Sequence, residues 1–165
     1  STPLRDRFGA IFRLDFYQKG EIFKILKRTA SILEMNIQDD ALTEIAGRSR
    51  GTPRIANRVL KRVRDFAQVK NVKEISLEDA RSSLDSIGID ENGLENMDRK
   101  ILKNLIVNYN GGPTGGKSLA ISINEDIQTI EDVYEPYLIK EGFIERTSRG
   151  RIATDKAYAL FDLKK

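Results

Sequence analysis

The stretch Gly142-Phe-Ile-Glu-Arg-Thr-Ser-Arg-Gly-Arg-Ile-Ala-Thr154 decides the fold of the second half of this chain. Two short runs, 143–147 and 151–154, flank the tight Ser148-Arg-Gly150, and a turn glycine between such runs predicts a β-hairpin. Three segments with apolar residues at helical spacing precede the hairpin: Met97 to Tyr109, Leu119 to Ile123 and Thr129 to Leu138. Helix, helix, helix and hairpin, in roughly 70 residues, is the order of a winged helix-turn-helix.

The first half of the chain predicts a small helical bundle. Apolar residues recur at helical spacing over 20–35 and 42–46. Thr52-Pro53 is typical of a helix start, and Ser76 with Asp79 resembles a capping box that opens a fourth helix. The turn formers and acids of 88–93 mark the best linker. We therefore predict a mainly α protein with a four-helix domain over 19–89 and a winged helix over 90–165. Residues 1–18 precede both domains and end in an alternating, strand-like stretch.

Composition excludes several classes of chemistry. The 165 residues contain no cysteine and no histidine, which removes disulfides, thiol nucleophiles, zinc fingers and serine–histidine triads. No apolar run approaches the roughly 20 residues of a membrane helix, and no signal peptide is recognisable. The net charge of +3 is too small to indicate nucleic-acid binding by itself. Because residues 91–165 hold 11 basic and 12 acidic side chains, any DNA contact there must come from a local cluster.

One apparent phosphate-binding motif is a coincidence of glycines. Gly111-Gly-Pro-Thr-Gly-Gly-Lys-Ser118 matches the pattern G-x-x-x-x-G-K-[ST] in full. That pattern binds phosphate when a buried strand precedes it, whereas here the apolar spacing of 97–109 predicts a helix. We interpret the segment as a flexible turn between two helices.

Arginines form three clusters, for which the sequence predicts different roles. Residues 48–64 contain seven basic side chains and no acid. Arg54 lies in the first turn of its predicted helix, so anion binding by Arg54 and an ordinary solvated basic face remain equal alternatives. Arg5-Asp-Arg7-Phe8 is, from its residues alone, a surface loop. Arg146, Arg149 and Arg151 lie on the predicted hairpin, and in a winged helix we favour contact with DNA phosphates over an ordinary polar turn.

Six strings of this chain occur together in one known family. They are Ser1-Thr-Pro-Leu-Arg-Asp-Arg-Phe-Gly9, Arg13-Leu-Asp-Phe-Tyr-Gln18, Arg50-Gly-Thr-Pro-Arg-Ile-Ala-Asn-Arg58 with Arg62-Val-Arg-Asp-Phe66, Met97-Asp-Arg-Lys100, Thr129-Ile-Glu-Asp-Val-Tyr-Glu-Pro-Tyr-Leu-Ile139 and residues 142–151. The chain thereby resembles the RuvB family, the ATP-dependent motors of Holliday-junction branch migration in bacteria. The resemblance covers almost the whole chain, and 51–58 is its most specific part.

The resemblance implies a role for individual residues. Arg7 matches the family's arginine finger, which acts on ATP held by a neighbouring subunit. Arg54 matches the second sensor and Tyr17 matches a tyrosine beside the nucleotide of the same subunit. Arg146 and Arg151 match wing arginines that touch junction DNA, and Arg149 joins them by its place in the hairpin. Residues 1–18 would then be the end of an AAA+ ATPase core, and 19–89 the AAA+ lid.

The resemblance also implies partners and a cofactor. We expect ATP with Mg²⁺, with the ion site, the phosphate loop and the acidic motif upstream of Ser1, so that the chain alone should not hydrolyse ATP. The expected partners are Holliday-junction DNA, further copies of the chain in a hexameric ring, and RuvA through an upstream surface, all in the bacterial cytoplasm. Two alternatives remain: a sequence-specific winged-helix transcription regulator, and the lid and winged helix of a replication-initiator ATPase.

Overall fold

The computed structural model describes residues 15–163 of the chain. The chain folds as two compact units, and the boundary between them falls between Ser83 and Leu84. Twelve segments of regular structure follow one another in these residues, and all but two are helical. The only strands among the described residues form one antiparallel hairpin. The mainly α class predicted from the sequence is therefore confirmed.

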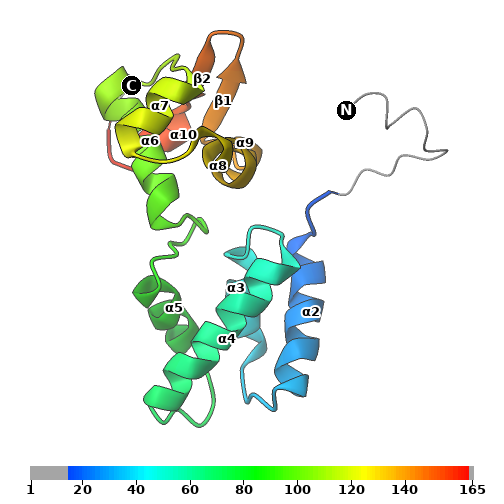
Figure 1. The fold of residues 1–165 in the computed structure, drawn as a ribbon. Helices are drawn as coiled ribbons and strands as arrows, with labels where there is room; N and C mark the ends of the chain where they lie inside the picture. The colour runs from blue at the N-terminus through cyan, green and yellow to red at the C-terminus, as the bar shows by residue number, and fades with distance from the viewer. Residues whose placement is uncertain (1–14, 164–165) are drawn as a thin grey trace, which may run out of the picture. The chain divides into compact units, whose positions relative to one another are not determined.

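The first unit is built on three packed helices. α2 (Lys19–Ile32) packs against α3 (Asp39–Gly47) and α4 (Pro53–Val69), and α5 (Leu77–Ser86) follows (Figure 1). The facing sides contribute fully buried aliphatic side chains, each of which stabilises the fold by about 1.5–3 kcal/mol. They are Ile22, Leu26, Leu42, Ile45 and Leu60.

Both predicted helix starts of this unit are confirmed. Thr52 is the N-cap of α4, and Pro53 occupies the first turn, where its missing N–H costs nothing. At α5, the backbone N–H of Ser76 donates to Asp79 Oδ2 at 3.0 Å, and the Asp79 N–H donates back to Ser76 Oγ at 3.2 Å. The hydroxyl and backbone N–H of Ser76, both donating to the carboxylate, lower the pKa of Asp79 below its usual value.

The second unit contains three helical segments followed by a hairpin. α6 (Asn96–Tyr109) and α7 (Gly116–Ile123) precede a helical path made of α8 (Ile127–Thr129), the π-helical η1 (Ile130–Tyr134) and α9 (Glu135–Lys140). β1 (Ile144–Thr147) and β2 (Gly150–Ala153) form the hairpin, and α10 (Asp155–Ala159) closes the unit (Figure 1). One apolar core joins all of these elements. The predicted order of a winged helix is confirmed.

The third helical path begins earlier than the sequence suggested. We expected its start at Thr129, but helix begins at Ile127 because the Asp126 carboxylate accepts the Thr129 N–H at 2.9 Å as its cap. Tyr137 is buried, and its hydroxyl donates to the Asn92 carbonyl at 2.8 Å. That bond ties α9 to the segment before α6.

The predicted linker is an ordered turn within the second unit. Asp90 Oδ1 accepts the backbone N–H groups of Asn92 and Leu94 at 3.0 and 2.9 Å. Arg99 on α6 donates to Asp90 Oδ2 at 2.9 Å and to the Gly88 carbonyl at 2.9 Å. These bonds fix residues 88–94 on the start of α6.

No helix within residues 15–163 combines the length and the apolar content that crossing a lipid bilayer requires.

Candidate functional site

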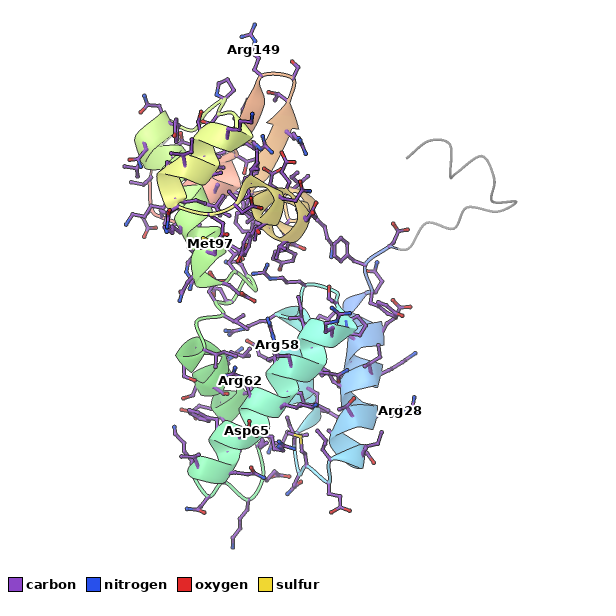
Figure 2. All side chains as sticks on the ribbon, viewed as in Figure 1. Arg28, Arg58, Arg62, Asp65, Met97 and Arg149 are labelled. Atoms are coloured by element: carbon purple, nitrogen blue, oxygen red, sulfur yellow. The ribbon has the colours of Figure 1, made fainter. Side chains whose placement is uncertain are left out.

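The hairpin, which we call the wing (residues 144–153), presents its arginines in two different settings. Arg149 is exposed in the turn between the strands, and Figure 2 shows it projecting from the tip. Lower down, Arg146 on β1 and Arg151 on β2 are directly paired across the ladder. Directly paired residues share one face of a hairpin, so both side chains project to the same side.

Two carboxylates of the third helical path receive this pair. Arg151 Nη2 donates to Glu131 Oε1 at 2.6 Å, and Arg151 Nε donates to Glu135 Oε1. Arg146 forms two longer ion pairs, with Nη2 at 3.4 Å from Glu131 Oε1 and Nη1 at 3.6 Å from Glu135 Oε2. The four side chains form one cluster, which we call the wing-base cluster.

Burial divides the wing-base cluster into an inner and an outer part. The side chains of Arg151 and Glu135 are only 7% and 2% exposed, whereas that of Arg146 is 54% exposed. Burial by itself lowers the pKa of Arg151, but the hydrogen bonds that Arg151 donates to Glu135 and Glu131 outweigh it and raise that pKa above its usual value. Arg151 is therefore a permanently charged, internally paired residue, and Arg146 faces solvent.

The glycine-rich segment 111–116 lies against the wing. Thr114 and Arg151 exchange two backbone hydrogen bonds of 2.9 Å. Gly112 has φ +94, and a Cβ built there would lie 2.2 Å from the Arg151 carbonyl oxygen, so only glycine fits. Helix α6, and no strand, precedes the segment, which agrees with our rejection of a phosphate loop. The expectation of a flexible turn is corrected: the backbone ladder to β2 orders it.

In the first unit, Tyr17 lies beside the start of α4. The Tyr17 N–H donates to the Gly51 carbonyl at 3.0 Å, and a hollow of about 250 Å³ is lined by both residues and by Thr52 and Pro53. Arg54 follows in the first turn of α4, where it is exposed and where no acidic residue occurs. The two residues predicted to contact nucleotide thus belong to the same small region.

The other arginines of 48–64 have mixed surroundings. Arg48 is buried and pairs with Glu44 at 2.6 Å. Although burial raises the pKa of Glu44, the hydrogen bonds from Arg48 and Arg81 lower it more, so that the net shift is downward. Arg58 and Arg62 lie one turn apart on α4 and are exposed (Figure 2). The basic segment is therefore partly structural.

Sequence reasoning missed Glu131 and Glu135 as partners of the wing. A spacing of four places both carboxylates on one helix face, which was the available signal. The carboxylates could not be matched to Arg146 and Arg151 without knowing that the wing folds back on this helix.

Two further predictions concern the arginine finger and the Mg²⁺ site. Arg7 lies outside the described residues 15–163. Among the described residues, no group of three or more acidic side chains could hold a metal ion.

Comparison with known proteins gives a consistent result across both units. Residues 17–90 match the family model of the RuvB AAA lid domain, and residues 91–162 match that of the RuvB C-terminal winged helix domain. The chain is 53% identical over 163 residues to the Holliday junction branch migration complex subunit RuvB of Oleidesulfovibrio alaskensis, covering 99% of this chain and 51% of that protein. The corresponding subunit of Fusobacterium nucleatum subsp. nucleatum is 50% identical over 161 residues, covering 98% and 48%.

A solved structure agrees with these relatives. The Thermotoga maritima RuvB Holliday junction branch migration motor superposes with a TM-score of 0.96 at 47% identity, covering 100% of this chain and 55% of that one. The chain thus spans about half the length of the relatives it matches.

Proposed function

This chain belongs to the RuvB family, of which it carries the lid and the winged-helix domain, and from that premise we propose that it holds DNA and senses nucleotide within a Holliday-junction branch-migration motor. The relatives are named as subunits of a branch migration complex. We extend that activity to this chain, with junction DNA as the substrate and RuvA and further copies of the chain in a ring as partners. The setting we propose is the bacterial cytoplasm.

The observation that carries the proposal is the arrangement of the wing. Arg149 at the tip and Arg146 on β1 are exposed cations on one hairpin, and such groups contact phosphate oxygens without reading bases. The face of η1 and α9 that a transcription regulator would use for base readout is instead acidic, and its Glu131 and Glu135 are engaged by the wing. This favours a grip on the DNA backbone that depends little on sequence.

The burial of Arg151 refines the role proposed for it. Its guanidinium is held by two carboxylates and is 7% exposed, so a direct phosphate contact would require the wing-base cluster to open. We propose that Arg146 and Arg149 contact the phosphates and that Arg151 anchors the wing on the third helical path. Arg151 then acts on DNA through the position of the wing.

The lid supports a second part of the proposal, the sensing of nucleotide. The hollow beside Tyr17 is smaller than the 300–1,000 Å³ of a typical ligand pocket, so it fits one part of a nucleotide and not the whole of ATP. Arg54 is an exposed cation in a helix first turn without acids, which suits a phosphate group. ATP with Mg²⁺ would supply the phosphoryl-transfer energy. Tyr17 and Arg54 would contact the nucleotide of the same subunit, and Arg7 would act on the ATP held by a neighbouring subunit.

The wing is tested by removing its exposed cations. The double substitution Arg146→Ala and Arg149→Ala should weaken binding of the chain to a labelled four-way junction about tenfold, because two charge-assisted phosphate contacts are lost. The slope of log K against log salt should become shallower by about 0.9 for each contact removed. Fluorescence anisotropy at several salt concentrations measures both quantities.

A matched variant separates the wing from the total charge. Lys103→Ala removes a cation from an exposed position of α6 in the same unit. It should leave both the affinity and the salt slope within about twofold of the parent. If Lys103→Ala weakened DNA binding as much as Arg146→Ala or Arg149→Ala made alone, binding would follow net charge. That result would overturn the proposed grip.

A further inference from the structure

One carboxylate oxygen in the wing-base cluster serves two arginines with different geometry. Glu131 Oε1 lies 2.6 Å from Arg151 Nη2 and 3.4 Å from Arg146 Nη2. The first distance is that of a strong charge-assisted hydrogen bond, and the second is at the outer limit of one. Glu131 therefore binds Arg151 firmly and Arg146 loosely.

Burial makes the same distinction. Arg151 is enclosed with Glu135, and its ion pair cannot be exchanged for solvent without exposing the wing base. Arg146 is 54% exposed, and its other ion pair, with Glu135 Oε2, is 3.6 Å long. Glu135 Oε2 is itself buried and accepts no hydrogen bond within the described residues. The Arg146–Glu131 ion pair joins side chains that are 54% and 28% exposed, so it contributes at most about 1 kcal/mol and an arriving phosphate can replace it.

We propose that Glu131 attenuates DNA binding by the wing, by competing with the DNA phosphate for Arg146. In the unbound chain, Glu131 neutralises part of the charge that the wing offers. When DNA arrives, Arg146 leaves Glu131 for a phosphate while Arg151 stays in place and preserves the position of the wing. A motor that moves along duplex must release each contact, and a resident carboxylate lowers the cost of that release. The inference rests on the proposed function of the wing.

The test is the substitution Glu131→Gln, which removes the charge and retains an oxygen that can accept from Arg151. Anisotropy titration of the full chain with a labelled four-way junction should show binding about two- to fivefold tighter than the parent, the range that an exposed ion pair represents. Unchanged or weaker binding by the folded variant would overturn the proposal.

Asp132→Asn is the matched control. It removes one negative charge from the neighbouring position of the same helix, but the Asp132 carboxylate is exposed and accepts from Gln128 at 2.9 Å, with no wing arginine beside it. We expect a change in affinity below about twofold, because an exposed charge that is not paired with a wing arginine acts on DNA only through screened repulsion. An effect equal to that of Glu131→Gln would show general electrostatics and would overturn the competition for Arg146.

A double-mutant cycle assigns the effect to Arg146. In an Arg146→Ala background, Glu131→Gln should tighten binding no more than Asp132→Asn does. If Arg146→Ala does not weaken binding at all, the proposed wing grip fails. If Arg146→Ala weakens binding but Glu131→Gln does not strengthen it, only the attenuation fails. If Glu131→Gln unfolds at a much lower temperature than the parent, Glu131→Asp takes its place in the test. The shorter side chain withdraws the carboxylate from Arg146 by one methylene, so DNA binding is expected to become tighter.

Discussion

Arg7→Ala should lower ATP hydrolysis about 10³- to 10⁵-fold, the loss expected when an arginine finger is removed from a phosphoryl-transfer site. The assay uses a chimaera in which residues 1–165 replace the matching segment of Thermotoga maritima RuvB, of which the chain covers 55%. A finger stabilises charge that develops on the transferring phosphoryl group, so the turnover number should fall while nucleotide affinity changes little. Steady-state hydrolysis and equilibrium nucleotide binding separate the two quantities.

Mixing variants tests whether the finger acts between subunits. A second chimaera should carry a substituted phosphate-loop lysine in its Thermotoga part and keep Arg7. Neither variant alone should hydrolyse ATP at an appreciable rate, but mixed rings place an intact Arg7 beside an intact phosphate loop and should regain part of the activity. Absence of recovery at every mixing ratio would contradict a finger that acts on a neighbour. Arg5→Ala is the matched control, and it should retain most of the activity.

Glu135→Leu should destabilise the winged-helix unit by about 3–5 kcal/mol, because it leaves Arg151 buried without its main partner. A charge enclosed in this way can neither reach water nor titrate, since an arginine side chain remains protonated. The chain has no tryptophan, so hydrogen exchange of the β2 amides, followed by NMR, is the suitable measure of local stability. The exchange rates of those amides should rise by more than 100-fold.

Two further variants test whether the cost comes from the loss of the buried partner of Arg151. Replacing both partners, Glu135→Leu with Arg151→Leu, should recover most of the lost stability, because a buried ion pair exchanged for apolar groups is often neutral. Glu131→Gln should cost much less than Glu135→Leu, since Glu131 is 28% exposed and glutamine keeps an acceptor. If the double variant were as unstable as Glu135→Leu, the instability would reflect packing and not charge.

The elements of this fold were predictable where local signals agree. Thr52-Pro53 and the pair Ser76 and Asp79 satisfy backbone groups at their own helix ends, so nothing distant is needed to interpret them. The hairpin was equally clear, because a turn glycine between two strand-like runs fixes its own register. The start of the third helical path was misplaced, since aspartate and threonine both cap helices and only the structure shows that Asp126 does so.

The candidate site was less predictable because its decisive contacts are long-range. Arg146 and Arg151 look equivalent in sequence, two cations on one hairpin. Their difference arises from Glu131 and Glu135, which lie 11 to 20 positions earlier and meet them only after the wing folds back. In the same way, the Gly112 segment was interpreted as a flexible turn because its partner, the Arg151 backbone, lies on β2. Burial and pairing of this kind are properties of the packed unit.

Binding to two four-way junctions of identical shape and unrelated arm sequence distinguishes a grip on phosphates from base readout. Because the proposed contacts join wing cations to phosphates, the chain should bind both junctions within about twofold and with the same steep salt dependence. A sequence-reading winged helix would instead distinguish them, because each mismatched base pair costs about 1–3 kcal/mol. A tenfold or larger preference for one sequence, retained when Arg146 and Arg149 are replaced by alanine, would contradict the account.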